Sequence, residues 1–184
     1  MRARFEAEGD VIVVTGGANG IGRALAHAAA KAGARIVVCD VDEAAMAALS
    51  DVPGISTRRL DVSDRADVFA VLGEVEGQFG KIDGLVCAAA IQPRSPVQHI
   101  EPAEWDRVLR TNLDGVVWCY QAVVAGMVAR RSGSIIAFTS GLAHQGWAGA
   151  SAYAASKAAL IAFAKSAAKE KRNIGCASIS SRRA

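Results

Sequence analysis

The segment VIVVTGGANGIG, residues 11–22, decides the fold of this chain. It begins with the apolar run Val11–Val14, which predicts a buried strand. A glycine-rich turn follows, and an Ala-rich helix is predicted over Ile21–Ala32, with Gly33 in the position that a helix C-terminal cap prefers. A strand, a glycine turn and a helix in this order predict the start of a βαβ unit.

The same alternation of strands and helices continues along the chain. Further strands are predicted at Arg35–Asp40, Ile55–Leu60, Ile82–Cys87, Ser134–Thr139 and, as a possible sixth, Ile174–Ile179. Further helices are predicted at Asp42–Leu49, from an Asp64 cap to about Phe79, at Pro102–Arg130, and from Ala150 to about Arg172. Apolar strands separated by helices predict a parallel sheet covered on both faces. We therefore expect an α/β fold, with residues 1–184 forming a single domain around a Rossmann-type doubly wound parallel sheet.

Composition and charge narrow the class of protein. The 184 residues are 52% hydrophobic with a net charge of +3, which is typical of a globular protein rather than a disordered one. The positive excess lies from Lys165 onward, so we expect a solvated basic end and no nucleic-acid partner. No signal peptide or membrane span is evident. The cysteines are Cys39, Cys87, Cys119 and Cys176, and their wide spacing favours buried, reduced thiols, a cytoplasmic location and no metal site.

The glycine turn and the second strand together predict a dinucleotide site. Glycines at Gly16, Gly20 and Gly22 would let the backbone approach a pyrophosphate closely, at a helix N-terminus with free N–H groups. Asp40 ends the second strand, where a carboxylate can bind the adenosine ribose hydroxyls and repel a 2′-phosphate. No cation follows it in Val41 or Asp42, so we expect NAD to be preferred over NADP. The alternative is that Asp40 serves only as a turn or cap residue.

Several motifs at wide spacing then occur together. The turn has the spacing TGxxxGxG at Thr15–Gly22, and Asp61 follows the third strand. Asn112 lies in Asn-Leu-Asp-Gly, Ser140 follows the fifth strand, and Tyr153-Ala-Ala-Ser-Lys157 has the spacing YxxxK. Alone, each has an ordinary structural explanation, but together they resemble the single-domain branch of the short-chain dehydrogenase/reductase family.

This resemblance implies an NAD(P)-dependent oxidoreductase that interconverts a secondary alcohol and a ketone. A free tyrosine has a pKa near 10, and a lysine one helical turn away favours the phenolate, so Tyr153 is expected to be the general acid/base. The resemblance further implies that Lys157 binds the nicotinamide ribose, Ser140 holds the substrate oxygen and Asn112 supports a proton path. The expected catalytic residues are Asn112, Ser140, Tyr153 and Lys157. The expected cofactor-binding residues are Gly16, Ala18, Asn19, Gly20, Ile21, Gly22, Asp40, Val41, Asp61, Val62, Ala88, Ala89, Ala90, Tyr153 and Lys157. A small-molecule alcohol or ketone is the expected partner, in a homodimer or homotetramer.

Two departures from the family pattern leave alternatives open. Cys87-Ala88-Ala89-Ala90 replaces the usual Asn-Asn-Ala-Gly after the fourth strand, which keeps room for the cofactor but removes amide hydrogen bonds. The C-terminal substrate lid and last strand of the family are expected to be missing. A non-catalytic dinucleotide-binding or scaffold protein is therefore the main alternative, and a methyltransferase remains possible on fold alone. His144, Trp147, Pro93 and Arg94 are candidates for substrate selection, although surface or packing roles are more common for such residues.

Overall fold

A computed structural model describes residues 7–170 and 175–181 of the chain. Its sheet has the order β3-β2-β1-β4-β5-β6 with every neighbouring pair parallel, as the alternation of strands and helices predicted. The strands are β1 (Val11–Thr15), β2 (Arg35–Asp40), β3 (Ile55–Arg59), β4 (Gly84–Cys87), β5 (Ser134–Ser140) and β6 (Gly175–Ser181). The chain order reverses between β1 and β4, and the carboxyl ends beside such a reversal are where ligands bind in open α/β sheets.

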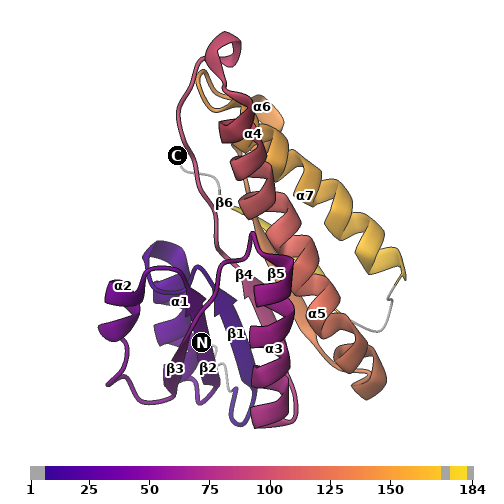
Figure 1. The fold of residues 1–184 in the computed structure, drawn as a ribbon. Coiled ribbons are helices and arrows are strands. Elements are labelled where there is room, and N and C mark those ends of the chain that lie inside the picture. The colour runs from indigo at the N-terminus through magenta and orange to yellow at the C-terminus, as the bar shows by residue number, and fades with distance from the viewer. Residues whose placement is uncertain (1–6, 171–174, 182–184) are drawn as a thin grey trace, which may run out of the picture.

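Helices cover both faces of the sheet (Figure 1). They are α1 (Gly20–Lys31), α2 (Glu43–Ala47), α3 (Arg65–Phe79), α4 (Pro102–Leu109), α5 (Gly115–Arg130), α6 (Leu142–Gln145) and α7 (Ser151–Glu170). One core lies between the sheet and α3, α5 and α7, and a second lies under α1 and α2. In β2 four consecutive residues are buried, whereas β5 alternates between buried and half-buried residues, so within the described chain only one face of β5 is fully covered.

Local sequence explains where most of these elements begin. The Asp64 carboxylate accepts the N–H groups of Ala66 and Asp67 at 2.8 and 3.3 Å, which confirms it as the predicted cap of α3. Gly33 follows the end of α1 with a φ of +96°, a conformation that glycine adopts without strain. The sixth strand also forms, although Ile174, with which we expected it to begin, lies outside the described residues.

The predicted helix Pro102–Arg130 is not one regular α-helix. A π-helical turn (Arg110–Asp114) separates α4 from α5, and Asn112 lies inside it. Such turns widen the backbone by one residue and are frequent at functional sites. The structure also contains two short elements that we did not predict, a 3-10 turn (Val97–His99) and α6.

Candidate active site

A cavity of about 620 Å³ opens at the carboxyl ends of β1 to β4, at the reversal of strand order. Most of the predicted cofactor-binding residues meet there. The lining consists of Gly16, Asn19, Gly20, Ile21, Gly22, Asp40, Val41, Leu60, Asp61, Val62, Ser63, Ala88, Ala89, Ala90, Ile91, Arg107 and Thr111. Ala18, Tyr153 and Lys157, which we also expected to bind cofactor, do not line it.

The glycine turn forms one wall of this cavity from backbone alone. Gly16 has a φ of +64°, and its N–H donates to the carbonyl of Cys39 at 2.8 Å. A Cβ at Gly16 would lie 2.5 Å from Cα of Ala89, and a Cβ at Gly22 would collide with the Gly16 carbonyl oxygen. The α1 N-cap residue, Asn19, makes no capping hydrogen bond through its side chain. The arrangement suits a group that approaches backbone closely and accepts N–H donors, as a pyrophosphate does.

Asp40 connects this wall to the end of β2. Its carboxylate accepts the N–H of Ala18 at 3.0 Å, that of Val41 at 2.8 Å and that of Asp42 at 3.2 Å. Ala18 is buried, and its amide faces Asp40 rather than the cavity. Asp40 therefore orders the turn, the structural role that we weighed as an alternative, while it also lines the cavity.

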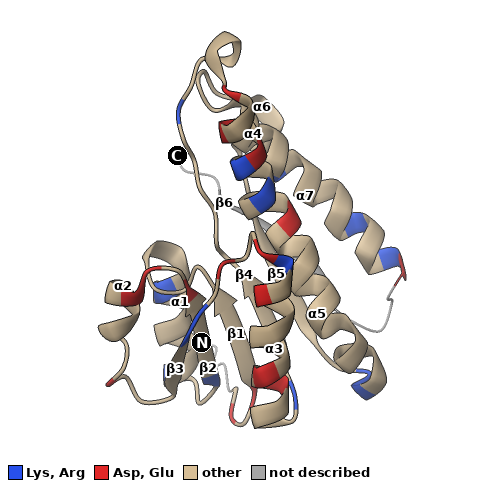
Figure 2. Cartoon of the chain, in the orientation of Figure 1, with Lys and Arg blue, Asp and Glu red and all other residues tan. Residues whose placement is uncertain are grey.

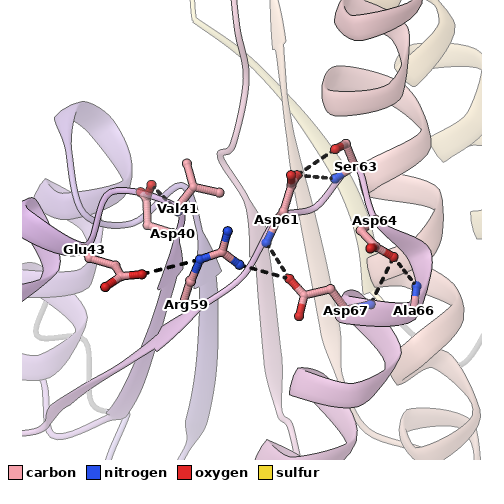
Figure 3. A network of polar contacts seen from close by, with 9 residues as sticks. All are labelled: Asp40, Val41, Glu43, Arg59, Asp61, Ser63, Asp64, Ala66 and Asp67. Carbon is pink, nitrogen blue, oxygen red and sulfur yellow. Dashed lines mark hydrogen bonds and ion pairs between the residues drawn. The ribbon is translucent and has the colours of Figure 1, made fainter.

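Acidic side chains lie around the carboxyl ends of β2 and β3 (Figure 3), and two of them, Asp40 and Asp61, line the cavity. The Asp61 carboxylate accepts the N–H and hydroxyl of Ser63 at 2.9 and 2.7 Å, which fixes its position. In the parallel register of β2 and β3, Arg59 lies opposite Asp40. The neighbouring strand therefore places a cation near Asp40, which the sequence did not indicate. The Arg59 guanidinium lies 3.5 Å from Glu43 and 3.9 Å from Asp67 and is thus partly neutralised.

The Tyr153–Lys157 pair lies on α7, one turn apart. Nζ of Lys157 is 5.7 Å from the Tyr153 ring centroid and donates to the Phe138 carbonyl at 2.8 Å. The lysine is 3% exposed, and this burial lowers its pKa from 10.5 to about 8. A cation is thereby held beside the tyrosine ring.

Asn112 is fully buried and joins α7 to the loop that follows β4. Its Oδ1 accepts the Ile91 N–H at 2.8 Å, and its Nδ2 donates to the Ile91 carbonyl at 2.9 Å. Nδ2 also lies 3.2 Å from Oγ of Ser156, which in turn donates to the Tyr153 carbonyl at 2.7 Å. Since Ile91 lines the cavity, this junction links the cavity to the helix that carries Tyr153.

Ser140 ends β5, and its hydroxyl accepts the Leu142 N–H at 3.2 Å. It makes no hydrogen bond to Tyr153 in this structure. Of the candidates for substrate selection, Arg94 lies 5.9 Å from the ring centroid of Trp147, and that ring is 60% exposed.

Leu60, Ser63, Ile91, Arg107 and Thr111 line the cavity although the sequence did not indicate them. A signal existed for Thr111, because it directly precedes Asn112. Arg107 lies on α4, four residues before Thr111, and the π-helical turn that contains Thr111 lies between α4 and α5.

Three cysteines are buried and unbridged, namely Cys39, Cys87 and Cys119. Burial raises the pKa of Cys39 to about 12, and a hydrogen bond with Cys87 raises that of Cys119. The thiols of Cys39 and Cys119 are therefore poor nucleophiles, because the thiolate is the reactive form. Within residues 7–170 and 175–181, no group of His, Cys, Asp and Glu side chains is arranged to hold a metal ion. None of the helices in that part of the chain has the length and apolarity that crossing a membrane requires.

Comparisons with known proteins agree with this geometry. A family model described as short chain dehydrogenase matches residues 10–180. The chain is 36% identical to the 3-oxoacyl-(acyl-carrier-protein) reductase of Escherichia coli, over 91% of this chain and 70% of that protein. It is 39% identical to galactitol 2-dehydrogenase of Agrobacterium fabrum, over 86% of this chain and 63% of that protein.

The fold is likewise similar to solved structures. A gluconate 5-dehydrogenase from Burkholderia cenocepacia, in complex with NADP and tartrate, superposes with a TM-score of 0.89 and 34% identity. That match covers 96% of this chain and 72% of the other. A metagenomic short-chain oxidoreductase in complex with NADP also gives a TM-score of 0.89, at 29% identity, over 96% of this chain and 83% of the other.

Proposed function

This chain belongs to the short-chain dehydrogenase family of NAD(P)-dependent oxidoreductases, and from that premise we propose that it interconverts a secondary alcohol and a ketone with Tyr153 as the general acid/base. The observation that carries the proposal is the buried Lys157, held by the Phe138 carbonyl beside the Tyr153 ring. A buried cation is costly unless it has a partner or a function. Simple dinucleotide binding would not need the Tyr153 hydroxyl beside this lysine.

The residues of the cavity fit a nicotinamide dinucleotide. The turn is packed so closely that neither Gly16 nor Gly22 has room for a Cβ, and the first turn of α1 offers N–H groups to phosphate oxygens. Asp40 and Asp61 would receive the adenosine portion. When bound, the cofactor supplies a hydride acceptor or donor. Tyr153 then takes or gives the hydroxyl proton, Lys157 stabilises its phenolate, and Ser140 orients the substrate oxygen.

We further propose that NAD is preferred over NADP. Asp40, Asp42 and Glu43 lie at the end of β2 and the start of α2, so a 2′-phosphate there would meet several negative charges. The one nearby cation that pairs with Asp40 across the strands, Arg59, already interacts with Glu43 and Asp67. The two similar structures described above contain NADP, so this preference needs its own measurement.

A polyol, a sugar acid or a 3-hydroxyacyl thioester would be the substrate, by likeness to the relatives described above. The expected homodimer or homotetramer and the cytoplasmic location also stay predictions.

The test is a fluorescence titration with NADH and NADPH, followed by turnover of these three substrate classes. We expect saturable NADH binding, weaker NADPH binding, and turnover that Tyr153→Phe reduces by about 10²- to 10⁴-fold with NADH affinity nearly unchanged. Binding without turnover in either protein would support the non-catalytic alternative. Equal turnover in both would remove Tyr153 from the mechanism.

A further inference from the structure

The side chains that line the cavity carry more negative than positive charge, which disfavours a ligand that contains a pyrophosphate. The acidic side chains in the lining are Asp40 and Asp61, and within the described chain Arg107 is the one basic side chain among the lining residues. A dinucleotide brings two negative charges on its pyrophosphate. Dipoles at the α1 terminus compensate part of this charge, since a helix end carries about half an elementary charge.

Arg107 belongs to α4, away from the glycine turn in sequence. Thr111, four residues further along and inside the π-helical turn, also lines the cavity, so two side chains of this helical segment reach it. Figure 2 shows both basic and acidic residues on α4, and acidic residues near the starts of α2 and α3. Of the charged residues of α4, Arg107 is the one that lines the cavity. A positive group thus reaches the cavity from α4, in addition to the N–H groups that α1 supplies.

The Arg107 side chain is exposed and makes no hydrogen bond, ion pair or ring contact with any residue of the described chain. Other arginines near the site differ in this respect. Arg59 contacts two carboxylates, and Arg65 lies 4.3 Å from the Phe69 ring centroid and 5.5 Å from that of Trp118. Arg107 can therefore bind a ligand without first breaking an interaction in the protein.

We propose that Arg107 is a ligand of the cofactor pyrophosphate, supplied by α4 in addition to the N–H groups of α1. This inference rests on the proposed function, since it requires that the cavity binds a dinucleotide. A planar guanidinium can donate two hydrogen bonds to phosphate oxygens, a geometry that a lysine ammonium cannot reproduce. The contribution of Arg107 to the binding of the pyrophosphate would weaken as the salt concentration rises, because this side chain is exposed to solvent.

The experiment compares Arg107→Ala with the matched control Arg110→Ala. Arg110 lies three residues further along and is also exposed, but it lines a neighbouring cavity and not this one. Affinity is measured by NADH fluorescence, and by competition for NADPH and ADP-ribose, at low and high salt. We expect Arg107→Ala to weaken NADH and ADP-ribose binding equally, by about 5- to 10-fold, and to reduce the salt dependence. Arg107→Lys should restore part of the affinity, and Arg110→Ala should change it by less than 2-fold.

The outcomes separate this inference from the proposed function. Failure of the wild-type chain to bind NADH would overturn the proposed function and this inference with it. Normal wild-type binding, with Arg107→Ala within 2-fold of it, would overturn this inference alone. A loss confined to NADPH would assign Arg107 to the 2′-phosphate instead, and an equal loss in Arg110→Ala would indicate a general charge effect; either result contradicts the proposal. Because Arg107 is exposed, thermal unfolding should show that the variant is folded.

Discussion

The two sides of the site are constructed from different parts of the polypeptide. The glycine wall, residues 15–22, is one continuous segment that presents backbone N–H groups and has no room for a Cβ at Gly16, Gly17 or Gly22. The other side holds the proposed catalytic residues Asn112, Ser140, Tyr153 and Lys157 (the catalytic side). It is assembled from three separated segments by hydrogen bonds of side chains. Substitutions in the glycine wall are limited by steric overlap with neighbouring backbone. On the catalytic side, the effect of a substitution depends on which hydrogen bonds the replaced side chain made.

This difference predicts on which side a residue proposed for catalysis lowers the stability of the fold. The glycine wall is formed by backbone atoms and contains no buried charged side chain. The catalytic side buries Asn112 completely and leaves Lys157 only 3% exposed. Buried polar groups must be paired, and a buried charge is costly even then. Substitutions at the glycines of the glycine wall should therefore lower the free energy of unfolding. On the catalytic side, replacement of the buried Lys157 should raise it.

The largest effect is expected from Gly16→Ala. The added methyl would lie 2.5 Å from the Ala89 N and Cα, at a φ of +64°, so both backbone segments must move. Steric overlap and the left-handed conformation together should lower the free energy of unfolding by about 4 kcal/mol. Urea unfolding of the cofactor-free protein measures this. The matched control is Gly9→Ala, which has a φ of +77° but nothing within 4 Å of the added Cβ and should cost about 1 kcal/mol. Similar losses in both variants would refute the close approach of β1 to the loop after β4.

A somewhat smaller effect is expected from Asn112→Leu, which keeps the side-chain volume and removes its polar atoms. The Ile91 N–H and carbonyl would both lose their partner, at a cost of about 3 kcal/mol in the free energy of unfolding. Hydrogen exchange should also become faster at the Ile91 amide, whose only partner among residues 7–170 and 175–181 is Asn112 Oδ1. Asn112→Asp separates the two bonds, because a carboxylate still accepts from the Ile91 N–H but cannot donate to its carbonyl. Unchanged protection of that amide in Asn112→Leu would mean that the junction does not depend on the asparagine.

The same contrast explains how much could be predicted from the sequence. The glycine turn and Asp40 were predictable because the atoms that matter belong to one βα unit, where backbone geometry follows from local residue types. Arg59 was missed because its proximity to Asp40 depends on how β3 pairs with β2.

Arg107 and Thr111 were missed for a different reason. Their direction depends on how α4 lies over the sheet, and the π-helical turn after Leu109 changes the helix phase in a way that hydrophobic periodicity does not show. The YxxxK spacing placed Tyr153 and Lys157 on one face, but it could not reveal that the lysine is buried and bound to a carbonyl of β5. Local pattern thus predicted the glycine turn and the helical pairing of Tyr153 with Lys157, and tertiary packing determined their environment.

The smallest effect, and the one of opposite sign, is expected from Lys157→Met. Burial lowers the pKa of Lys157 from 10.5 to about 8, so the folded protein holds this proton less tightly than the unfolded chain does. At about 1.4 kcal/mol per pKa unit, the charged lysine costs about 3 kcal/mol below pH 8. Removing it also loses the charged hydrogen bond to Phe138, worth about 1.5 kcal/mol. The variant should therefore be more stable than the wild type at pH 7, by about 1.5 kcal/mol.

The sign of this difference should reverse with pH. Between pH 8 and 10.5 the unfolded chain binds more protons at this site than the folded protein does, so wild-type stability rises with pH there, whereas the methionine variant lacks that contribution. At pH 10 the wild type should thus equal or exceed Lys157→Met in the free energy of unfolding. Lys165→Met is the control, since Lys165 is an exposed lysine on the same helix and should give no difference at either pH. A Lys157→Met variant that is less stable at pH 7 would mean that the lysine stabilises the catalytic side, and that both sides of the site respond to substitution alike.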